Sequence, residues 1–156
     1  MIKAAFFDID GTLLSFKTHR IPASAQQVLD SFHEQGIACV IATGRPTYQM
    51  PDWLLDLGWD AYITLSGQHC FDAKGTYRSC PIDPDDVAVI VDQVAEGCYD
   101  SLCMQGENSF VNRLSERVVA AGSNAGIVYH EEPFDHAFDA PVYQFCAFVD
   151  PADEHI

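Results

Sequence analysis

The 156-residue sequence predicts an α/β protein with a parallel, doubly wound sheet, followed by a smaller α+β part. Mainly apolar runs at residues 2–7, 37–42 and 60–65 are typical of strands buried on both faces, as parallel sheets require. Apolar residues at helical spacing separate the first two runs. Each run ends abruptly in polar residues, and open α/β sheets bind their ligands at such carboxyl ends.

The elements of the first half follow in the order strand, helix, strand, helix, strand. Pro22 suits the first turn of a helix that Gly36 ends, and a shorter helix is predicted between Tyr48 and Leu57. Short connections of this kind give right-handed crossovers. The order is therefore that of half a doubly wound domain.

The pattern changes after residue 67. Residues 70–71 and 76–79 flank Asp72-Ala73-Lys74-Gly75 and predict a β-hairpin. Asp83 and Pro84 then open a helix as its N-cap and first residue. The remaining predicted elements are strands at 101–105 and 109–112, a helix at 114–121, and strands at 126–130 and 142–149. We therefore expect two parts, residues 1–80 and residues 81–156.

Charge and cysteine content exclude several classes of function. The formal charge of −15, from 8 basic and 23 acidic residues, argues against nucleic-acid partners and anionic membrane surfaces. No apolar run has the length of a membrane span. The six cysteines include no CxxC pair and no zinc-like Cys/His cluster, which favours reduced thiols and a cytoplasmic protein.

Two carboxylates mark the end of the first predicted strand. Asp8 and Asp10 cannot lie unpaired inside a core, because burying such charges is costly. We therefore expect them at the strand's carboxyl end, where Gly11 lets the backbone turn. Carboxylate and carbonyl oxygens suit Mg²⁺, and a divalent ion would offset the repulsion between this acidic chain and a phosphate group.

These residues resemble a known family. Asp8-Ile9-Asp10-Gly11-Thr12-Leu13-Leu14 is similar to the first motif of the haloacid dehalogenase-like hydrolases. Ala42-Thr43-Gly44-Arg45-Pro46 resembles the second motif in its Cof-type form. Ile63-Thr64-Leu65-Ser66-Gly67 resembles the end of that group's third strand, with Ser66 in place of the more usual Asn. The stretch after residue 80 resembles part of a type-IIB cap.

The resemblance implies a Mg²⁺-dependent phosphatase that acts on a small phosphorylated metabolite, such as a sugar phosphate or a phosphorylated cofactor. Asp8 would be the nucleophile that forms an aspartyl-phosphate, and Asp10 would be the general acid and base. The Asp8 carboxylate and the Asp10 backbone carbonyl would hold the metal.

The second motif implies the phosphate contacts. Gly11 would let the chain turn close to the phosphate, while the Thr43 hydroxyl and the Gly44 N–H would donate to phosphoryl oxygens. Arg45 would lie near the phosphate or the leaving group. The resemblance does not identify the substrate, and phosphoryl transfer between sugar positions remains an alternative to hydrolysis.

Two later motifs of the family, a lysine and a Gly-Asp-x-x-x-Asp loop, have no match here. The lysines are Lys3, Lys17 and Lys74, and none has a matching context. We therefore expect the first part of a longer protein that stops inside the cap. Residues 2–7 would then form a sheet edge, and the chain would be weakly active or inactive and prone to aggregate.

Other interpretations stay open at this point. The two aspartates could simply cap a turn, and Arg45 could pair with a surface acid. A receiver-like phospho-acceptor module also places acids and Mg²⁺ at parallel strand ends. A non-catalytic remnant could bind phosphate or a partner through the surviving residues. The sequence does not indicate an oligomeric state.

Overall fold

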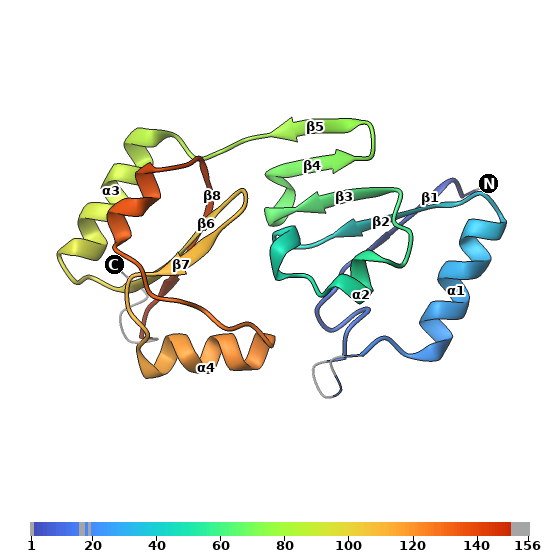
Figure 1. The fold of residues 1–156 in the computed structure, drawn as a ribbon, viewed down its shortest axis with the longest axis horizontal. Coiled ribbons are helices and arrows are strands. Elements are labelled where there is room, and N and C mark those ends of the chain that lie inside the picture. The colour runs from blue at the N-terminus through green and yellow to red at the C-terminus, as the bar shows by residue number, and fades with distance from the viewer. Residues whose placement is uncertain (1, 16–17, 19, 151–156) are drawn as a thin grey trace. The chain divides into compact units, whose positions relative to one another are not determined.

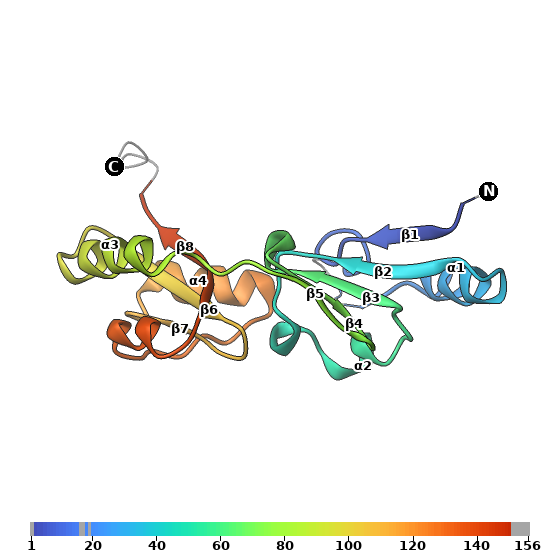
Figure 2. The same ribbon diagram turned by 90° about the horizontal axis from the view of Figure 1, so that it is seen from above.

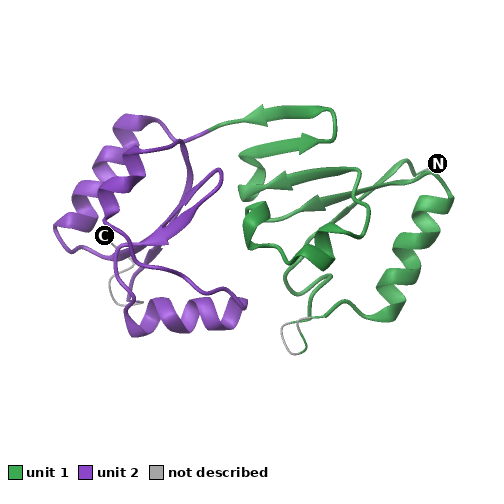
Figure 3. Ribbon diagram, viewed as in Figure 1, with its two compact units in different colours: residues 1–80 green, residues 81–156 purple. Residues whose placement is uncertain are grey.

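The computed structural model describes residues 2–15, 18 and 20–150. The chain divides into two compact units, residues 1–80 and residues 81–156 (Figure 3). Each unit has its own sheet and its own helices, so each is described by itself.

The first unit is built on a five-stranded sheet in the order β1-β2-β3-β4-β5 (Figure 1). The first three strands are parallel, and the last two form the antiparallel hairpin that the turn residues predict. The strands are β1 (Ala4–Phe7), β2 (Ala38–Ala42), β3 (Ala61–Thr64), β4 (His69–Asp72) and β5 (Gly75–Ser79). The predicted parallel α/β sheet is confirmed.

Both α-helices of this unit, α1 (Ala23–Glu34) and α2 (Asp52–Leu55), cover one face of the sheet (Figure 2). The two crossovers run in the same direction across the sheet, and right-handed connections then put both helices on one side. Short 3₁₀ turns follow β2 and β3 as η1 (Thr47–Gln49) and η2 (Leu65–Gly67). The buried core beneath the helices is made of Ile9, Leu13, Leu14, Leu29, Cys39, Ile41, Met50, Leu54 and Trp59.

The opposite face of the sheet is less covered. Phe6 points there and is 63% exposed, whereas its neighbour Phe7 packs against Phe32 and Trp59. Within the described residues, β1 pairs with β2 and is the edge of the sheet. An exposed apolar edge strand is a template for pairing with another chain.

The second unit has a three-stranded antiparallel sheet in the order β7-β6-β8. Asp83 caps its first helix by accepting a hydrogen bond from the Asp85 N–H at 2.9 Å, as the sequence predicts. Val87 and Val91 of that helix pack on Cys103 and Phe110 of the sheet. The elements are α3 (Pro84–Ala95), β6 (Asp100–Gln105), β7 (Ser109–Val111), α4 (Glu116–Ala125), η3 (Phe134–Phe138) and β8 (Val142–Phe148).

One predicted strand of this unit is absent. Residues 126–130 form no strand: Gly126 has a φ of 68° and ends α4 as its left-handed cap, and Val128 is 95% exposed. Only an isolated bridge from Val111 to Glu131 follows. The end of this segment contacts β7, since the Val111 N–H donates to the His130 carbonyl at 2.9 Å, but the pairing does not extend back to Gly126. The longest helices in the described part have 12 residues, and none is long and apolar enough to cross a membrane.

A small charged cluster follows this segment. The two oxygens of Glu132 bind different histidines, with His130 Nε2 at 3.0 Å and His136 Nδ1 at 2.9 Å. The hydrogen bond to Glu132 raises the pKa of His136, and the hydrogen bond from His136 lowers the pKa of Glu132. Asn108 also contacts Glu132, and Asp139 adds negative charge near His136.

The exposed edge at β1 leads to the first prediction. Phe6→Lys should reduce self-association, because it places a charge on an apolar edge strand without removing a buried side chain. Sedimentation velocity of the wild type and the variant measures the extent of self-association. Phe7→Lys is the matched comparison, and it should instead unfold the first unit, since Phe7 packs in the core. Equal self-association of Phe6→Lys and wild type would contradict the prediction.

The His136–Glu132 pair predicts a pH dependence of the second unit. The raised pKa of His136 contributes stability that is fully present below the ordinary histidine pKa of about 6.5. That stability is lost as the pH rises through the folded-state pKa. The lowered pKa of Glu132 also contributes stability, which is present above the ordinary glutamate pKa and is lost as the pH falls through the folded-state pKa.

We therefore expect the unit to melt at a lower temperature at about pH 8 than at about pH 6, and His136→Gln to flatten this difference. Circular dichroism of the melting curve measures it, with His33→Gln in the first unit as the control. An unchanged pH profile in His136→Gln would refute the assignment.

Candidate active site

The turn after β1 places the first two candidate residues. Gly11 has a φ of 79°, a value that favours glycine, and its N–H donates to the Leu14 carbonyl at 2.8 Å. Ile9 is fully buried and fixes the turn to the core. Asp8 on one side of it is exposed and Asp10 on the other is half-buried. The sequence-based expectation that both carboxylates lie at the strand's end agrees with this arrangement.

The two aspartates differ in their partners. Within the described residues, the Asp8 carboxylate accepts one hydrogen bond, from the Thr12 hydroxyl to Oδ2 at 3.3 Å. Asp10 instead binds Arg45 through both oxygens, with Nε to Oδ2 at 2.7 Å and Nη2 to Oδ1 at 2.6 Å. Asp8 thus keeps an oxygen available for chemistry, whereas the Asp10 oxygens are engaged.

Arg45 connects the ends of the first two strands. Its side chain is 11% exposed, and Nη1 also donates to the Gln49 carbonyl at 3.1 Å. Such a bidentate, largely buried pair is stronger and more directional than a surface ion pair. The structure brings Arg45 to an acid, as one sequence-based alternative proposes, and that acid is Asp10 of the candidate site.

Thr43 and Gly44 form the turn after β2. The Thr43 side chain is largely buried, and its Oγ1 accepts a hydrogen bond from the Arg45 N–H at 3.1 Å. This leaves the hydroxyl proton without an acceptor among the residues that the structure describes. Gly44 is exposed, and its N–H has no partner in the same set. Two adjacent donors therefore remain for a ligand.

The end of β3 braces this turn from the other side. The Ser66 N–H donates to the Thr43 carbonyl at 3.2 Å, and the Leu65 N–H donates to the Arg45 carbonyl at 3.4 Å. Both residues are left-handed, with φ of 56° for Ser66 and 51° for Leu65. The sequence analysis does not predict these two hydrogen bonds. The sequence signal at this position is the Ser66-Gly67 dipeptide that follows a predicted strand.

Two oxygens at the site are of the kind that magnesium binds. No group of three or more His, Cys, Asp or Glu side chains within residues 2–15, 18 and 20–150 could hold a metal. The Asp8 carboxylate and the Asp10 carbonyl, which accepts no hydrogen bond from a described residue, nevertheless offer two oxygens. Mg²⁺ retains several waters and is commonly held by one or two protein oxygens together with a phosphate.

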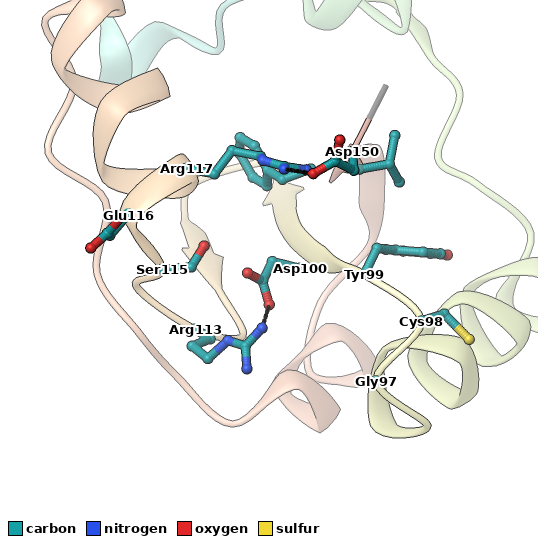
Figure 4. Close-up of a pocket in the computed structure, with 11 residues that line it drawn as sticks. Gly97, Cys98, Tyr99, Asp100, Arg113, Ser115, Glu116, Arg117 and Asp150 are labelled. Atoms are coloured by element: carbon teal, nitrogen blue, oxygen red, sulfur yellow. Dashed lines mark hydrogen bonds and ion pairs between the residues drawn. The ribbon is translucent and has the colours of Figure 1, made fainter. Parts of the chain in front are cut away.

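A second concave site lies within the other unit (Figure 4). This pocket of about 510 Å³ contains both arginines of residues 81–156, Arg113 and Arg117. Each is already paired, Arg113 with Asp100 at 2.8 Å and Arg117 with Asp150 at 2.6 Å. Because Glu116 also lines the pocket, its net charge is negative, so it offers no advantage to an anionic ligand.

Comparison with known proteins decides the family. A family model described as haloacid dehalogenase-like hydrolase matches residues 5–155. The chain belongs to this family. The matched range includes the candidate residues that follow β1 and β2. The α/β core sheet and the separate antiparallel sheet match part of a core and part of a cap of the family.

Solved structures of related hydrolases share the fold. A subclass IIB sugar phosphatase superposes with a TM-score of 0.83 at 31% identity, over 97% of this chain and 60% of that chain. A phosphatase from Bacteroides thetaiotaomicron has a TM-score of 0.81 at 29% identity, over 99% of this chain and 58% of that chain.

Two named proteins also match in sequence. A Streptococcus pyogenes protein is 31% identical over 97% of this chain and 32% of its own length. Its name describes a bifunctional phosphatase and peptidyl-prolyl cis-trans isomerase. An HMP-PP phosphatase from Enterobacter sp. is 34% identical over 54% of this chain and 32% of its own length. The chain thus spans about a third of these curated relatives and about three fifths of the solved structures.

The Asp10–Arg45 pair predicts a measurable coupling energy. We expect the double-mutant cycle of Asp10→Asn and Arg45→Gln to give a coupling of about 1–2 kcal/mol, because the pair is bidentate and mostly buried. Urea unfolding followed by tryptophan fluorescence measures it for this unit alone, since Trp53 and Trp59 are the tryptophans of the chain. The exposed hydrogen bond from Gln26 to Asp30 is the comparison pair. A coupling near zero would show that the pair does not hold the strand ends together.

Proposed function

We propose that the first unit carries the phosphoryl-transfer site of a Mg²⁺-dependent phosphatase, with Asp8 as nucleophile. One observation carries the proposal. The Asp10–Arg45 ion pair ties the Asp8 turn to the Thr43–Gly44 turn, so a nucleophilic oxygen and two unpaired donors share one end of the sheet. Membership of a hydrolase family supports the same chemistry.

The proposed reaction has two steps at Asp8. A carboxylate oxygen attacks phosphorus, an Asp8–phosphate bond forms, and the ester oxygen leaves as an alcohol after taking a proton. Water then attacks the same phosphorus, phosphate leaves, and the carboxylate returns. The Thr12 hydroxyl, 3.3 Å from Oδ2, orients the carboxylate and leaves Oδ1 as the attacking atom.

Asp10 is the proposed proton donor and acceptor. In the described arrangement both of its oxygens accept N–H bonds from Arg45, so transfer of a proton requires that Arg45 release one oxygen. A phosphoryl dianion offers the guanidinium another partner of suitable geometry. Binding of substrate would therefore prepare Asp10 for its role and bring Arg45 to the phosphate.

The remaining residues position the phosphoryl group. The Thr43 proton and the Gly44 N–H would donate to its oxygens, and Gly11 would let the turn approach closely. The Asp8 carboxylate and the Asp10 carbonyl would hold Mg²⁺, which supplies positive charge between the anionic nucleophile and the anionic substrate when bound.

The proposed substrate is a small phosphorylated metabolite, such as a sugar phosphate or a phosphorylated cofactor. Structural similarity to a subclass IIB sugar phosphatase and sequence similarity to an HMP-PP phosphatase support this class. We assign residues 1–80 to the core and residues 81–156 to the cap that selects the substrate. The six free cysteines favour a reducing compartment such as the cytoplasm.

A second candidate is phosphate binding without turnover. The observation that favours it is the double engagement of Asp10 by Arg45, which leaves no oxygen of Asp10 poised for proton transfer. The two candidates share the phosphate site and differ in whether Asp10 acts.

The proposal predicts a specific response to beryllium fluoride, which mimics phosphate on an aspartate. We expect ¹⁹F NMR of the chain with Mg²⁺ to show a bound signal that Asp8→Asn abolishes. Asp10→Asn should keep the signal, since it removes proton transfer but retains the carbonyl ligand.

Hydrolysis of p-nitrophenyl phosphate should need Mg²⁺ and fall by about 10²-fold or more in Asp10→Asn.

Asp30→Asn is the matched control, because Asp30 is an exposed aspartate of α1 whose hydrogen bond from Gln26 an asparagine oxygen can also accept. It should change neither the signal nor the rate. A bound signal that survives in Asp8→Asn would refute Asp8 as the nucleophile. A bound signal in wild type, together with any hydrolysis that Asp10→Asn leaves unchanged, would favour the second candidate.

A further inference from the structure

The end of β3 has an unusual backbone. Leu65, Ser66 and Gly67 have φ values of 51°, 56° and 89°, so three successive residues are in the left-handed region. Glycine adopts this region freely, but leucine and serine do so only at a conformational cost. Non-glycine residues held in this way are concentrated at functional sites, where the surrounding structure compensates for the strain.

The surrounding contacts explain how this conformation is held. The Leu65 side chain is 1% exposed and anchors the turn in the protein interior. The Leu65 and Ser66 N–H groups point at the carbonyls of Arg45 and Thr43, at 3.4 and 3.2 Å. The turn after β3 is therefore built against the turn that carries the proposed phosphate donors.

The conformation also determines where the Ser66 side chain lies. A Cβ atom added to Gly44 would be 3.5 Å from Ser66 Oγ, so the hydroxyl lies directly beside Gly44. Ser66 is exposed, and its hydroxyl has no hydrogen-bond partner among the described residues. The hydroxyl is thus free to donate to a ligand that Gly44 also contacts.

We propose that Ser66 is a further substrate-positioning residue, whose hydroxyl donates to a phosphoryl oxygen beside the Gly44 N–H and the Thr43 hydroxyl. This inference rests on the proposed phosphate site and adds a third donor to it. The donor comes from a third strand, so the cradle draws on the ends of both β2 and β3. All three donors are neutral and leave the site's charge unchanged.

The alternative is that Ser66 merely completes a turn. Glycine or asparagine would then serve better, because both tolerate a positive φ at lower conformational cost than serine. A serine at this position retains a short hydroxyl at the expense of backbone strain. Both interpretations predict that glycine raises stability, but only the proposed role predicts that loss of the hydroxyl weakens phosphate binding.

Replacing Ser66 separates these readings. Ser66→Gly removes both the strain and the hydroxyl, Ser66→Ala removes the hydroxyl alone, and Ser66→Asn relieves the strain and keeps a donor. The probe is inorganic phosphate, titrated into the chain with Mg²⁺ and followed by calorimetry. Urea unfolding followed by tryptophan fluorescence reports the stability of the same unit.

We expect Ser66→Gly to unfold at higher urea and to bind phosphate about tenfold more weakly, as for loss of a hydrogen bond to a charged group. Ser66→Ala should bind as weakly as Ser66→Gly, and Ser66→Asn should be more stable while keeping wild-type affinity. Ser24→Ala, at an exposed serine of α1, is the control that changes neither.

The outcomes distinguish this inference from the proposed function. If wild type binds phosphate and Thr43→Ala weakens it, but Ser66→Gly and Ser66→Ala bind normally, Ser66 is a turn residue and the phosphate site stands. If wild type binds no phosphate, the proposed site fails and the role of Ser66 fails with it.

Discussion

The Arg45 guanidinium holds the candidate site together. Its two hydrogen bonds to Asp10 span the ends of β1 and β2, which are 35 residues apart in sequence. A bidentate pair fixes both distance and orientation, because the planar donor fork matches the carboxylate. The pair adds to the strand ladder and to the core packing that joins Leu13 and Leu14 to Met50. The pair therefore contributes, together with those contacts, to the position of Asp8 relative to Thr43 and Gly44.

The turn after β2 is held from two directions. Arg45 reaches toward Asp10 on one side, and the N–H groups of Leu65 and Ser66 contact carbonyls of the same turn on the other. None of these contacts uses the Thr43 hydroxyl proton or the Gly44 N–H. The turn is therefore rigidly supported while its own donors remain available. Preorganised donors of this kind stabilise developing charge at little reorganisation cost.

Local sequence signals account for most of the fold. The apolar runs predict the strands β1 to β3 and their parallel pairing, and Asp83 predicts the cap of α3. The predicted strand at residues 126–130 is wrong because Gly126 is the left-handed cap of α4, and the pairing with β7 that follows is confined to a single bridge at Glu131. Periodicity describes how a segment prefers to fold, but it carries no information on which neighbour is present.

The candidate site was predictable in residue identity and only in part in geometry. Asp8, Asp10, Thr43, Gly44 and Arg45 follow from the two motifs. The partner of Arg45 does not, since it is a contact between side chains that are distant in sequence. The left-handed Leu65 and Ser66 were also not predictable, because neither residue type favours that region. Tertiary contacts impose both features.

The charge of the site explains why a divalent ion belongs to the proposed function. Arg45 neutralises Asp10, and Asp8 then remains as one uncompensated negative charge next to donors that carry none. A phosphate dianion entering this site meets net repulsion, and the formal charge of −15 on the chain adds to it. Hydrogen bonds from Thr43 and Gly44 orient the dianion but do not cancel this repulsion. Two positive charges held by Asp8 and the Asp10 carbonyl would bring the substrate and its nucleophile together. Removing Arg45 would make the site more negative still, so its pairing with Asp10 serves the electrostatics as well as the geometry.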